Sequence, residues 1–564
     1  MKLSIGKFQN EFEKVAAQFE TEKIASRIWN KDFTVWSDKP DEITNRLGWL
    51  TSPQNSLSHL KEINSFVEGV RKDGFKKALL LGMGGSSLAP EVFRLTFGVK
   101  AGYLDLSVLD STDPQAVVNF AKTFDPAETL YIVSTKSGGT VETFSFMKYF
   151  YNLTAEKVGK EKVGNHFVAI TDPGSGLEST AKQLNYRKIF LNDPNIGGRY
   201  SALSLFGIVP AALMGIDVAQ VLRIAEAFAY SSKDNSSAKN PSAQNGIVMG
   251  LLSKHGIDKV TFLNTEKLSY FGAWVEQLIA ESTGKIGKGI LPVVGEEILS
   301  PESYSTDRLF VYVRLKDDDS LREKVNAFQN AGHPVAEIVL HDVYELGAEF
   351  FRWEFATIVS SWLINIQPFD QPNVESAKIV ARKMVQEYKE SGKLPELNYS
   401  VEESGIKISS ALNDSTLAGL ITKFLESMNS QGASLPKPYV SIQAYLTMNK
   451  ENEGLLQTLR TKIQEKYKVA TTVGFGPRFL HSTGQLHKGD AGNGLFIQFI
   501  YDSAEDIAIP DEAGDDKSSM TFNVLIKSQA LGDRQALLDN QRRLITVDLG
   551  KDVSGSLKMI SELI

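Results

Sequence analysis

The stretch that decides the fold is residues 77–87, KALLLGMGGSS, in which a short apolar run ends in glycine and a glycine-rich turn follows. Similar apolar runs follow it, each closed by Gly, Ser, Asp or Pro, and the segments between them are long enough for helices. Strands that alternate with helices predict a parallel, doubly wound α/β sheet. The further expected strands of this sheet are Leu104–Asp110, Thr129–Ser134, Phe167–Asp172 and Lys188–Asp193.

The same alternation restarts near residue 255 and predicts a second α/β unit, with helices at about 345–364 and 373–390. Its expected strands are Lys259–Leu263, Leu309–Leu315 and Val335–Leu340. A third unit is expected up to the C-terminus, with strands at Val440–Leu446, Leu495–Ile500, Phe522–Ile526 and Arg543–Asp548.

The expected organisation has four parts. Residues 1–60 are predicted to form a polar, helical N-terminal extension. Two α/β domains over residues 61–250 and 251–395 follow, and a C-terminal α/β unit covers residues 396–564. The candidate linkers are Ser391–Ser400 and Asn429–Pro438.

Composition limits the classes of protein to which the chain can belong. With 42% hydrophobic and 23% charged residues in 564, it has the composition of a globular protein. A net charge of −7 argues against a dedicated nucleic-acid binder, and the absence of cysteine excludes disulfides and thiolate nucleophiles. The N-terminus has no apolar core of signal-peptide length, and the apolar stretch Ser201–Ile216 falls short of the ~20 residues that span a membrane. We therefore expect a cytoplasmic protein without membrane or nucleic-acid partners.

The glycine-rich turn at 82–87 offers backbone N–H groups to an anion, because it joins an expected strand to an expected helix. A dinucleotide fingerprint requires glycine at the sixth position, where this chain has Ser87. Asp110, at the end of the next strand, could act as the ribose-binding acid. The dinucleotide reading is therefore incomplete, and a tight turn needed for packing explains the glycines equally well.

A second polar loop, residues 134–140 (STKSGGT), also lies between a strand and a helix. Hydroxyl groups, one ammonium group and a flexible glycine pair meet there at a helix N-terminus. This combination suits a phosphomonoester. With the turn at 82–87, it predicts an anion-binding crevice at the carboxyl edge of the first sheet.

Three more segments carry candidate chemistry. Arg199 follows two glycines, so its guanidinium can enter a pocket, and we count Gly198 as substrate-binding because it permits close backbone approach. Gln277 and Glu281 are four residues apart on one helical face, and the negative end of that helix favours proton uptake by a carboxylate. The segment 367–372 breaks one helix and starts the next, which carries Lys378.

In this order, these segments resemble the glucose-6-phosphate isomerase family from about residue 45 to residue 380. The resemblance implies two sugar-isomerase-type domains, a homodimer, and interconversion of glucose 6-phosphate and fructose 6-phosphate without metal or cofactor. Residues 475–489 (FGPRFLHSTGQLHKG) are similar to the C-terminal part of isomerases fused behind a transaldolase. No transaldolase region is present, so no transaldolase activity is expected. The histidines show no H-x-x-x-H or H-E-x-x-H pattern, which agrees with a metal-free site.

The resemblance also implies roles for individual residues. Glu281 is the base that moves a proton between C1 and C2, and Arg199 stabilises the enediolate. Glu142 belongs to the pocket, and Gln371 and Lys378 belong to a segment whose lysine is associated with opening of the sugar ring. The groups expected to hold the substrate phosphate are Ser86, Thr135, Lys136, Ser137, Thr140 and Gln277.

The chain departs from the family pattern in one respect. Commoner members have a ring-opening histidine after the glutamate segment, whereas this chain has no histidine between Glu281 and His333. His481 and His487 are the candidates to replace it, although both fit a structural role equally well. Lys378 could act without a histidine, and Glu349 is a weaker candidate.

Other functions stay open at this stage. A non-catalytic sugar-phosphate-binding regulator would keep the hydroxyl loop, but the presence of both Glu281 and Arg199 favours the enzyme. A nucleotide-dependent oxidoreductase is disfavoured by Ser87. Mannose 6-phosphate is a possible further substrate, with Thr283 near the base as a candidate influence. The C-terminal unit is expected to act as a lid or a dimer element.

Overall fold

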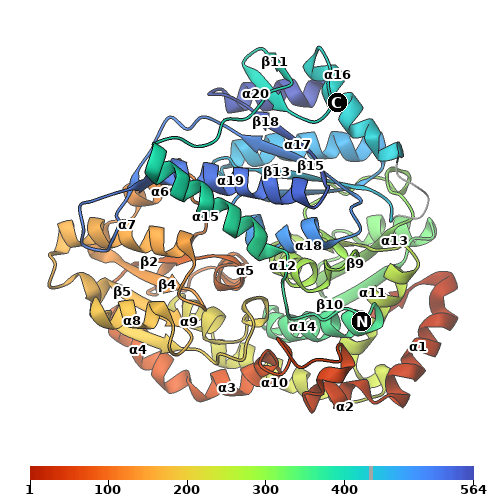
Figure 1. The fold of residues 1–564 in the computed structure, drawn as a ribbon. Coiled ribbons are helices and arrows are strands. Elements are labelled where there is room, and N and C mark those ends of the chain that lie inside the picture. Colours follow the sequence, from red (N-terminus) through yellow and green to blue (C-terminus); the bar gives the residue numbers. More distant parts are fainter. Residues whose placement is uncertain (431–435) are drawn as a thin grey trace.

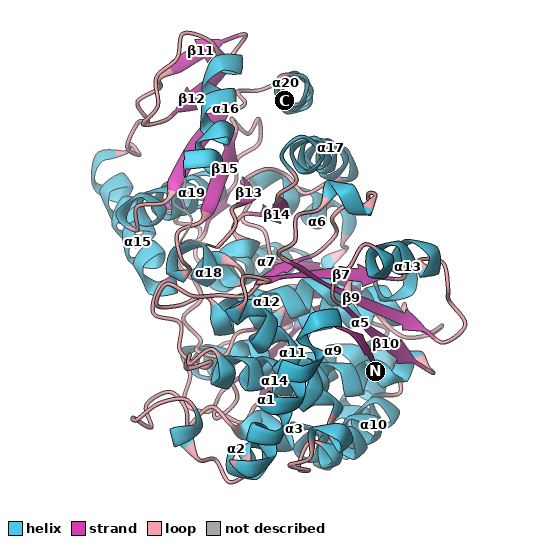
Figure 2. Cartoon of the chain, turned by 90° about the vertical axis from the view of Figure 1, so that its right-hand side faces the viewer, coloured by secondary structure: helices cyan, strands magenta, loops and turns pink. Residues whose placement is uncertain are grey.

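The computed structural model describes residues 1–430 and 436–564. Within them the strands form three large sheets and one two-stranded ribbon (Figure 1). Helices cover the sheets, and the C-terminal sheet lies at one end of the molecule (Figure 2). The predicted α/β class with parallel sheets is confirmed. The proposed linker Asn429–Pro438 includes residues 431–435, which lie outside the described residues, and the predicted domain boundaries stay predictions.

The first sheet is parallel throughout, and its order follows the predicted doubly wound pattern. Its central strands are buried because helices cover both faces, which explains their continuous apolar runs. In order across the sheet, the strands are β3 (Asp105–Leu109), β2 (Lys77–Gly82), β4 (Thr129–Ser134), β5 (Phe167–Thr171) and β6 (Lys188–Leu191). The helices of this unit are α4 (Leu60–Lys72), α5 (Leu88–Phe97), α6 (Pro114–Thr123), α7 (Val141–Val158), α8 (Gly176–Gln183), α9 (Leu205–Leu213) and α10 (Val218–Ser231).

The second sheet joins four parallel strands to one antiparallel strand from the N-terminus. That strand, β1 (Lys2–Ser4), pairs with β10, whereas the sequence predicted only helices over residues 1–60. The other strands are β10 (Val335–Leu340), β9 (Arg308–Leu315), β7 (Lys259–Asn264) and β8 (Leu291–Val293). The remaining helices of residues 1–391 are α1 (Gln9–Thr21), α2 (Ile24–Trp29), α3 (Ser52–Ser58), α11 (Pro241–Lys254), α12 (Phe271–Thr283), α13 (Arg322–Asn330), α14 (Leu346–Leu363) and α15 (Val374–Ser391).

The apolar stretch Ser201–Ile216 contains helix α9, all of whose residues are buried. It packs within a core that also includes Trp49, Trp274 and Trp353. Among the described residues, no helix combines the length and apolar character needed to cross a membrane.

The third unit contains a mixed sheet in which β12 pairs antiparallel with both of its neighbours, β11 and β18. Its strands, in order, are β11 (Val401–Glu403), β12 (Ile406–Ser409), β18 (Arg543–Asp548), β15 (Gly494–Ile500), β13 (Tyr439–Ala444) and β14 (Ala470–Phe475). The ribbon is β16 (Ala508–Ile509) with β17 (Met520–Thr521). The helices are α16 (Leu417–Glu426), α17 (Lys450–Tyr467), α18 (Gly484–Gly489), α19 (Phe522–Asp539) and α20 (Val553–Glu562).

The strand predicted at Phe522–Ile526 is wrong, because these residues begin helix α19. Thr521 caps this helix by accepting a hydrogen bond from the Val524 N–H. Buried side chains recur along the helix at Phe522, Leu525, Ile526 and Gln529, which is helical spacing. A short apolar run does not distinguish a strand from a buried helix, and here the Thr521 cap marks the start of a helix.

A buried ionic contact joins the third unit to the second. Glu296, whose side chain is 1% exposed, accepts hydrogen bonds from Arg308 at 2.9 and 3.2 Å. The same carboxylate accepts from the backbone N–H and the hydroxyl of Thr471, at 2.9 and 3.0 Å. Since Thr471 lies in β14, one carboxylate connects strands of two sheets.

Replacement of Glu296 by alanine is expected to reduce the free energy of unfolding by about 3–5 kcal/mol, because it leaves the fully buried Arg308 without its main partner. Chemical denaturation followed by far-UV circular dichroism measures the loss. The control is Glu297→Ala, which removes the exposed neighbouring carboxylate. Equal stability of both variants would show that this contact does not hold the units together.

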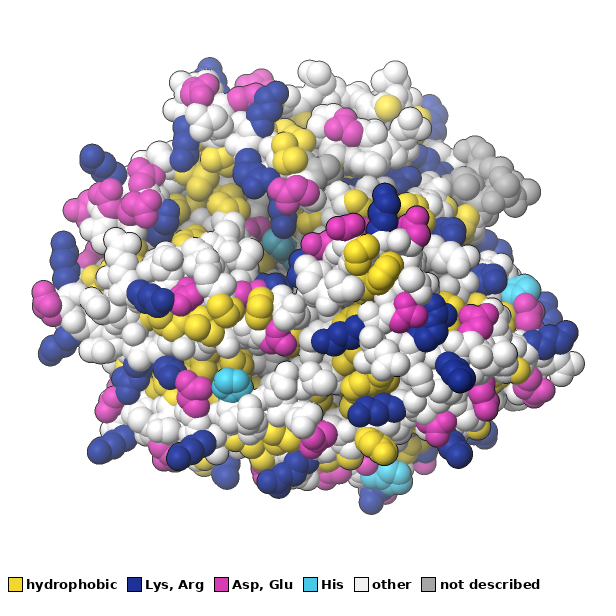
Figure 3. Space-filling model, turned by 60° about the horizontal axis from the view of Figure 1, so that its bottom comes forward, with side chains coloured by type: hydrophobic (Ala, Val, Ile, Leu, Met, Phe, Trp, Pro, Cys, Tyr) yellow, Lys and Arg dark blue, Asp and Glu magenta, His cyan; other side chains and the backbone are white. Residues whose placement is uncertain are grey.

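Charged groups of both signs are interspersed over the face of the molecule drawn in Figure 3, with hydrophobic side chains in small groups between them. A single-signed basic region, which would suit a polyanion, does not appear on that face.

Candidate active site

Two polar loops meet at the carboxyl edge of the first sheet. Strands β2 and β4 are neighbours, and Gly82 is the register partner of Ser134, so the loops that follow both strands start side by side. The second loop leads into α7, and its Thr135 and Thr140 hydroxyls are 2.9 Å apart. Hydroxyl groups therefore surround the positive end of a helix, which is suited to bind a phosphate.

Lys136 belongs to the same loop but points elsewhere. Its ammonium group pairs with Asp172 and donates to the Pro194 carbonyl at 3.0 Å. Burial raises the pKa of Asp172, although the ion pair with Lys136 opposes this shift. The structure therefore does not bring Lys136 into the group that Thr135 and Thr140 form.

The glycine-rich turn lies against the loop that carries Arg199. A Cβ added to Gly85 would lie 2.0 Å from the Gly198 carbonyl oxygen, so these two backbones approach as closely as glycine permits. Ser86, in the same turn, is buried beside Ser134, whose hydroxyl donates to the Ser86 carbonyl at 3.4 Å. A Cβ on Gly198 would meet no atom within 4 Å, so this residue borders open space.

Asp110 is already engaged, which bears on the dinucleotide alternative. Its carboxylate accepts a hydrogen bond from Arg478 at 2.6 Å and one from Ser87 at 3.2 Å. The acid that would hold a ribose is thus paired with a guanidinium from the C-terminal unit. This pairing favours a structural role for Asp110.

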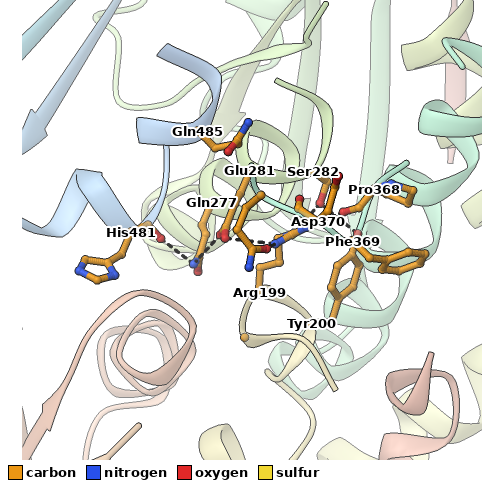
Figure 4. A network of polar contacts seen from close by, with 12 residues as sticks. Arg199, Tyr200, Gln277, Glu281, Ser282, Pro368, Phe369, Asp370, His481 and Gln485 are labelled. Atoms are coloured by element: carbon orange, nitrogen blue, oxygen red, sulfur yellow. Dashed lines mark hydrogen bonds and ion pairs between the residues drawn. The ribbon is translucent and has the colours of Figure 1, made fainter. Parts of the chain in front are cut away.

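Arg199 is buried and makes four hydrogen bonds and one ion pair within the chain (Figure 4). It donates to the Ser282 hydroxyl at 2.9 Å and to Gln371 Oε1 at 2.9 Å. It also donates to the carbonyls of Pro368 and Asp370, at 2.5 and 3.2 Å. One of its terminal nitrogens lies 3.1 Å from Glu281 Oε1. The expected base and the expected enediolate-stabilising cation are therefore in direct contact.

Helix α12 carries Gln277 and Glu281 on one face, as the spacing predicts. The Gln277 amide donates to Glu281 Oε2 at 3.1 Å and to the His481 carbonyl at 2.7 Å. Gln277 Oε1 is buried without a partner among the described residues. Figure 4 shows the His481 ring directed away from Glu281, with Gln277 between them. Gln277 thus links the base to the C-terminal unit.

The His481 ring contacts Glu142, the acidic residue at the start of α7, with Nε2 2.9 Å from Oε1. Burial tends to raise the pKa of Glu142, but the charge and hydrogen bond of His481, together with the more distant Lys378, outweigh burial and lower it. The Glu142 carboxylate therefore stays ionised and can only accept hydrogen bonds. The neutral His481 tautomer that fits it carries its proton on Nε2.

A cavity of about 350 Å³ lies in front of the hydroxyl loop and collects residues from three parts of the chain. Ser137, Thr140 and Glu142 come from the first unit, and α15 contributes Lys378. From the C-terminal unit it includes Leu480, His481, Gly484, Lys488, Leu525 and Gln529. Glu281 and Arg199 do not line this cavity, and Gln277 connects them to it through His481.

His487 does not join this group. It is buried in α18, with its ring nitrogens 3.4 Å from the Ser441 hydroxyl and 3.2 Å from the Gln443 amide. Burial, assisted by the nearby Lys488 and Arg542, lowers its pKa well below the usual value. Glu349 lies elsewhere, paired with Arg352 at 2.8 Å. Of the ring-opening candidates, the structure therefore brings together His481 and Lys378.

The C-terminal unit packs closely on the helix that carries Glu281. A Cβ on Gly284 would lie 2.3 Å from Leu486 Cα, so only glycine fits where α12 ends. Gln485 donates to the Gly284 carbonyl at 2.9 Å. This contact, together with the Glu296 network, favours a fixed wall of the site over the expected lid.

Several residues of this site were not predicted from the sequence. Lys285 donates to the carbonyls of Gln367 and Asp370, at 2.7 and 2.5 Å, and to the Asp370 carboxylate at 2.7 Å. Burial, assisted by Arg199, lowers its pKa to about 7, while Asp370 and Glu281 oppose the shift. Lys285 follows Glu281 by four residues, and this spacing could have indicated that it belongs to the site. Nothing in the local sequence marks Ser282 or Gln529.

Comparison with known proteins agrees with this geometry. The family model described as "Phosphoglucose isomerase" matches residues 51–289. A probable glucose-6-phosphate isomerase of Methanococcus maripaludis is 29% identical over 388 residues, covering 61% of this chain and 85% of its own. A glucose-6-phosphate isomerase of Thermus thermophilus is 27% identical over 399 residues, covering 61% of this chain and 91% of its own. Residues 51–289 of the chain thus match the phosphoglucose isomerase model, and the chain is similar to these glucose-6-phosphate isomerases.

Two solved structures share the fold of this chain. A hypothetical protein from Thermus thermophilus matches with a TM-score of 0.59 and 23% identity, covering 68% of this chain and 99% of its own. A glucose-6-phosphate isomerase from Chlamydia trachomatis matches with a TM-score of 0.53 and 20% identity, covering 65% and 78%. The family model ends at residue 289, so the C-terminal unit lies outside the matched residues. Its likeness to transaldolase fusions stays a prediction.

Proposed function

We propose that this protein is an isomerase that interconverts glucose 6-phosphate and fructose 6-phosphate through an enediolate, with Glu281 as the base. The observation that carries the proposal is the contact between Glu281 and Arg199, which Gln277 connects through His481 to the cavity bordered by the hydroxyl loop. A carboxylate can move one proton between adjacent carbons, and the guanidinium offsets the negative charge that develops on oxygen. The phosphate at the hydroxyl loop supplies binding energy remote from the reacting carbons.

The residues form a consistent sequence of steps. Thr135, Ser137 and Thr140 hold the phosphate of the closed sugar ring at the N-terminus of α7. His481 takes the proton of the anomeric hydroxyl and returns one to the ring oxygen, which breaks the C–O bond of the ring. Glu281 then removes the C2 proton and delivers it to C1, and Arg199 stabilises the enediolate between these two transfers. Lys378, at the cavity wall, adds positive charge near the ring.

The proposal is tested by following conversion of fructose 6-phosphate to glucose 6-phosphate with purified protein in the presence of a chelator. We expect conversion at a rate that the chelator does not change. Binding of the sugar phosphate without conversion would support the alternative, a non-catalytic regulator on the same fold. Loss of activity on chelation would contradict a metal-independent reaction.

Replacement of His481 by asparagine is expected to slow isomerisation about 30- to 100-fold, because the amide cannot exchange the proton needed to open the ring. KM should change little, because the hydroxyl loop is intact. The matched control is His487→Asn, which removes the other candidate from the same segment and should leave the rate nearly unchanged. A larger loss in the His487 variant at equal folded fraction would reverse the assignment.

The family resemblance also leads us to propose a cytoplasmic homodimer. Sedimentation equilibrium of the purified chain tests the assembly directly, and a monomeric mass across micromolar concentrations would contradict it.

A further inference from the structure

A chain of three hydrogen bonds leads from the cavity into the protein. The Thr112 hydroxyl donates to Gln529 Oε1 at 2.7 Å, and Gln529 Nε2 donates to Glu142 Oε1 at 2.7 Å. The same Glu142 oxygen lies 2.9 Å from His481 Nε2. Thr112, Gln529 and Glu142 are all buried, at 0%, 5% and 4% exposure. Gln529 is therefore the link between a fixed threonine and the carboxylate that holds the histidine.

The direction of these bonds is determined by chemistry. An ionised carboxylate only accepts, so the amide of Gln529 must present its NH₂ group to Glu142. Its carbonyl oxygen then faces Thr112, whose hydroxyl donates to it. Glu142 prevents the amide from turning over, because the reversed amide would place its carbonyl oxygen against the carboxylate, and the Thr112 hydroxyl holds the carbonyl end of the amide in place.

Two donors meet on the same oxygen of Glu142. With Gln529 and His481 both bound to Oε1, the plane of the carboxylate is fixed, and so is the direction in which it accepts from the imidazole. His481 Nδ1 makes no hydrogen bond to any described residue and belongs to the side chain that lines the cavity. Fixing Nε2 on Glu142 therefore leaves Nδ1 as the nitrogen available to substrate.

We infer that Gln529, held by Thr112, is a positioning residue that holds the Glu142–His481 pair for opening of the sugar ring. The inference rests on the proposed isomerase function and deepens it. It assigns a role in ring opening to helix α19 of the C-terminal unit, 387 residues from Glu142 in the sequence. Gln529 acts through Glu142 and His481, whereas proton transfer between C1 and C2 depends on Glu281, which it does not contact.

The experiment separates ring opening from proton transfer between carbons. Exchange NMR measures interconversion of the α and β anomers of glucose 6-phosphate. Exchange of a C1 proton of fructose 6-phosphate with deuterated solvent measures the step assigned to Glu281. Replacement of Gln529 by leucine should slow anomerisation about tenfold or more. This is a fraction of the rate enhancement that general acid–base catalysis contributes, because His481 is still present but no longer held in place. Exchange per molecule of open-chain sugar should be unchanged.

Two further variants keep the inference testable if Gln529→Leu folds poorly. Thr112→Val removes only the hydroxyl that holds the Gln529 amide. It should slow anomerisation about threefold, which is less than the effect of Gln529→Leu because the amide itself remains. Gln529→Glu keeps the length of the side chain but places a second carboxylate against Glu142. Activity should return as the pH is lowered and the new side chain takes up a proton with which it can donate.

Gln498 provides a matched control. It is fully buried, donates to the Ala530 carbonyl at 3.0 Å and accepts from the Thr546 hydroxyl at 3.0 Å, so its bonds repeat those of Gln529 away from the cavity. Gln498→Leu should leave the ratio of anomerisation to exchange unchanged. If the wild type is active and folded Gln529→Leu shows an unchanged ratio of anomerisation to exchange, the inference is wrong and the proposed function still stands. Wild type that catalyses neither reaction removes the proposed function and the inference with it.

Discussion

Replacement of Glu281 by glutamine is expected to lower the rate of isomerisation at least about 10³-fold, because the amide cannot take the proton from C2 and return it to C1. The substitution keeps the size of the side chain, and Gln277 remains in place to bind it. Arg199 loses its ionic partner but keeps its bonds to Ser282, Gln371 and the 368–370 carbonyls. KM for fructose 6-phosphate should therefore change much less than kcat.

The measurement is conversion of fructose 6-phosphate to glucose 6-phosphate in the presence of chelator, run beside exchange of a C1 proton of fructose 6-phosphate with deuterated solvent. Both rates should fall together, because both report the same proton transfer. Anomerisation should persist, since His481 and Glu142 are untouched. This pattern would separate the base from the ring-opening group within one protein.

Glu276 supplies the control on the same helix. Burial raises the pKa of Glu276 to about 7, against the opposing charges of Arg460 and Arg478. Its neutral form is therefore readily accessible near neutral pH, and Glu276→Gln imitates that form. We expect nearly normal activity from this variant. If Glu281→Gln retained wild-type activity, the base would have to be another group, even within the same family.

Local features of the site could be predicted from the sequence because they depend on near neighbours in the chain. A strand that ends in glycine before a helix places its loop at the edge of a parallel sheet, which located the loop at 134–140 correctly. Helical spacing placed Gln277 and Glu281 on one face, and their hydrogen bond agrees with it. These inferences needed no knowledge of distant contacts.

Other features depend on contacts between distant segments, and the sequence could not supply them. Nothing near Lys136 indicates that Asp172 lies beside it, so the lysine was assigned to the phosphate. His481 and His487 are six residues apart, and only the packing of the C-terminal unit directs one to Glu142 and the other to Gln443. Because Phe522–Ile526 was predicted as a strand, helix α19, which brings Gln529 to Glu142, was not expected.

Replacement of Arg199 by lysine is expected to lower kcat by about 10²–10³-fold, comparable to the loss of a preorganised group that stabilises an oxyanion. Lysine retains the charge but has three donors at one point, whereas arginine has five in a plane. A single ammonium group cannot contact Glu281 while it also holds the carbonyls of Pro368 and Asp370. The positive charge should therefore lie in the wrong place for the enediolate.

The arrangement around Arg199 also specifies how substrate must enter. Since all three guanidinium nitrogens of Arg199 already donate hydrogen bonds, we expect an enediolate oxygen to displace one of these partners. Among the side chains that contact Arg199, Gln371 is the exposed one. We therefore expect substrate to replace the amide oxygen of Gln371. Gln371→Ala should consequently preserve most of kcat, while Arg199→Lys should not. Urea unfolding of both variants checks that they fold. Equal kcat losses in the two at equal stability would mean that the guanidinium only anchors the segment at 367–372 and does not act on the enediolate.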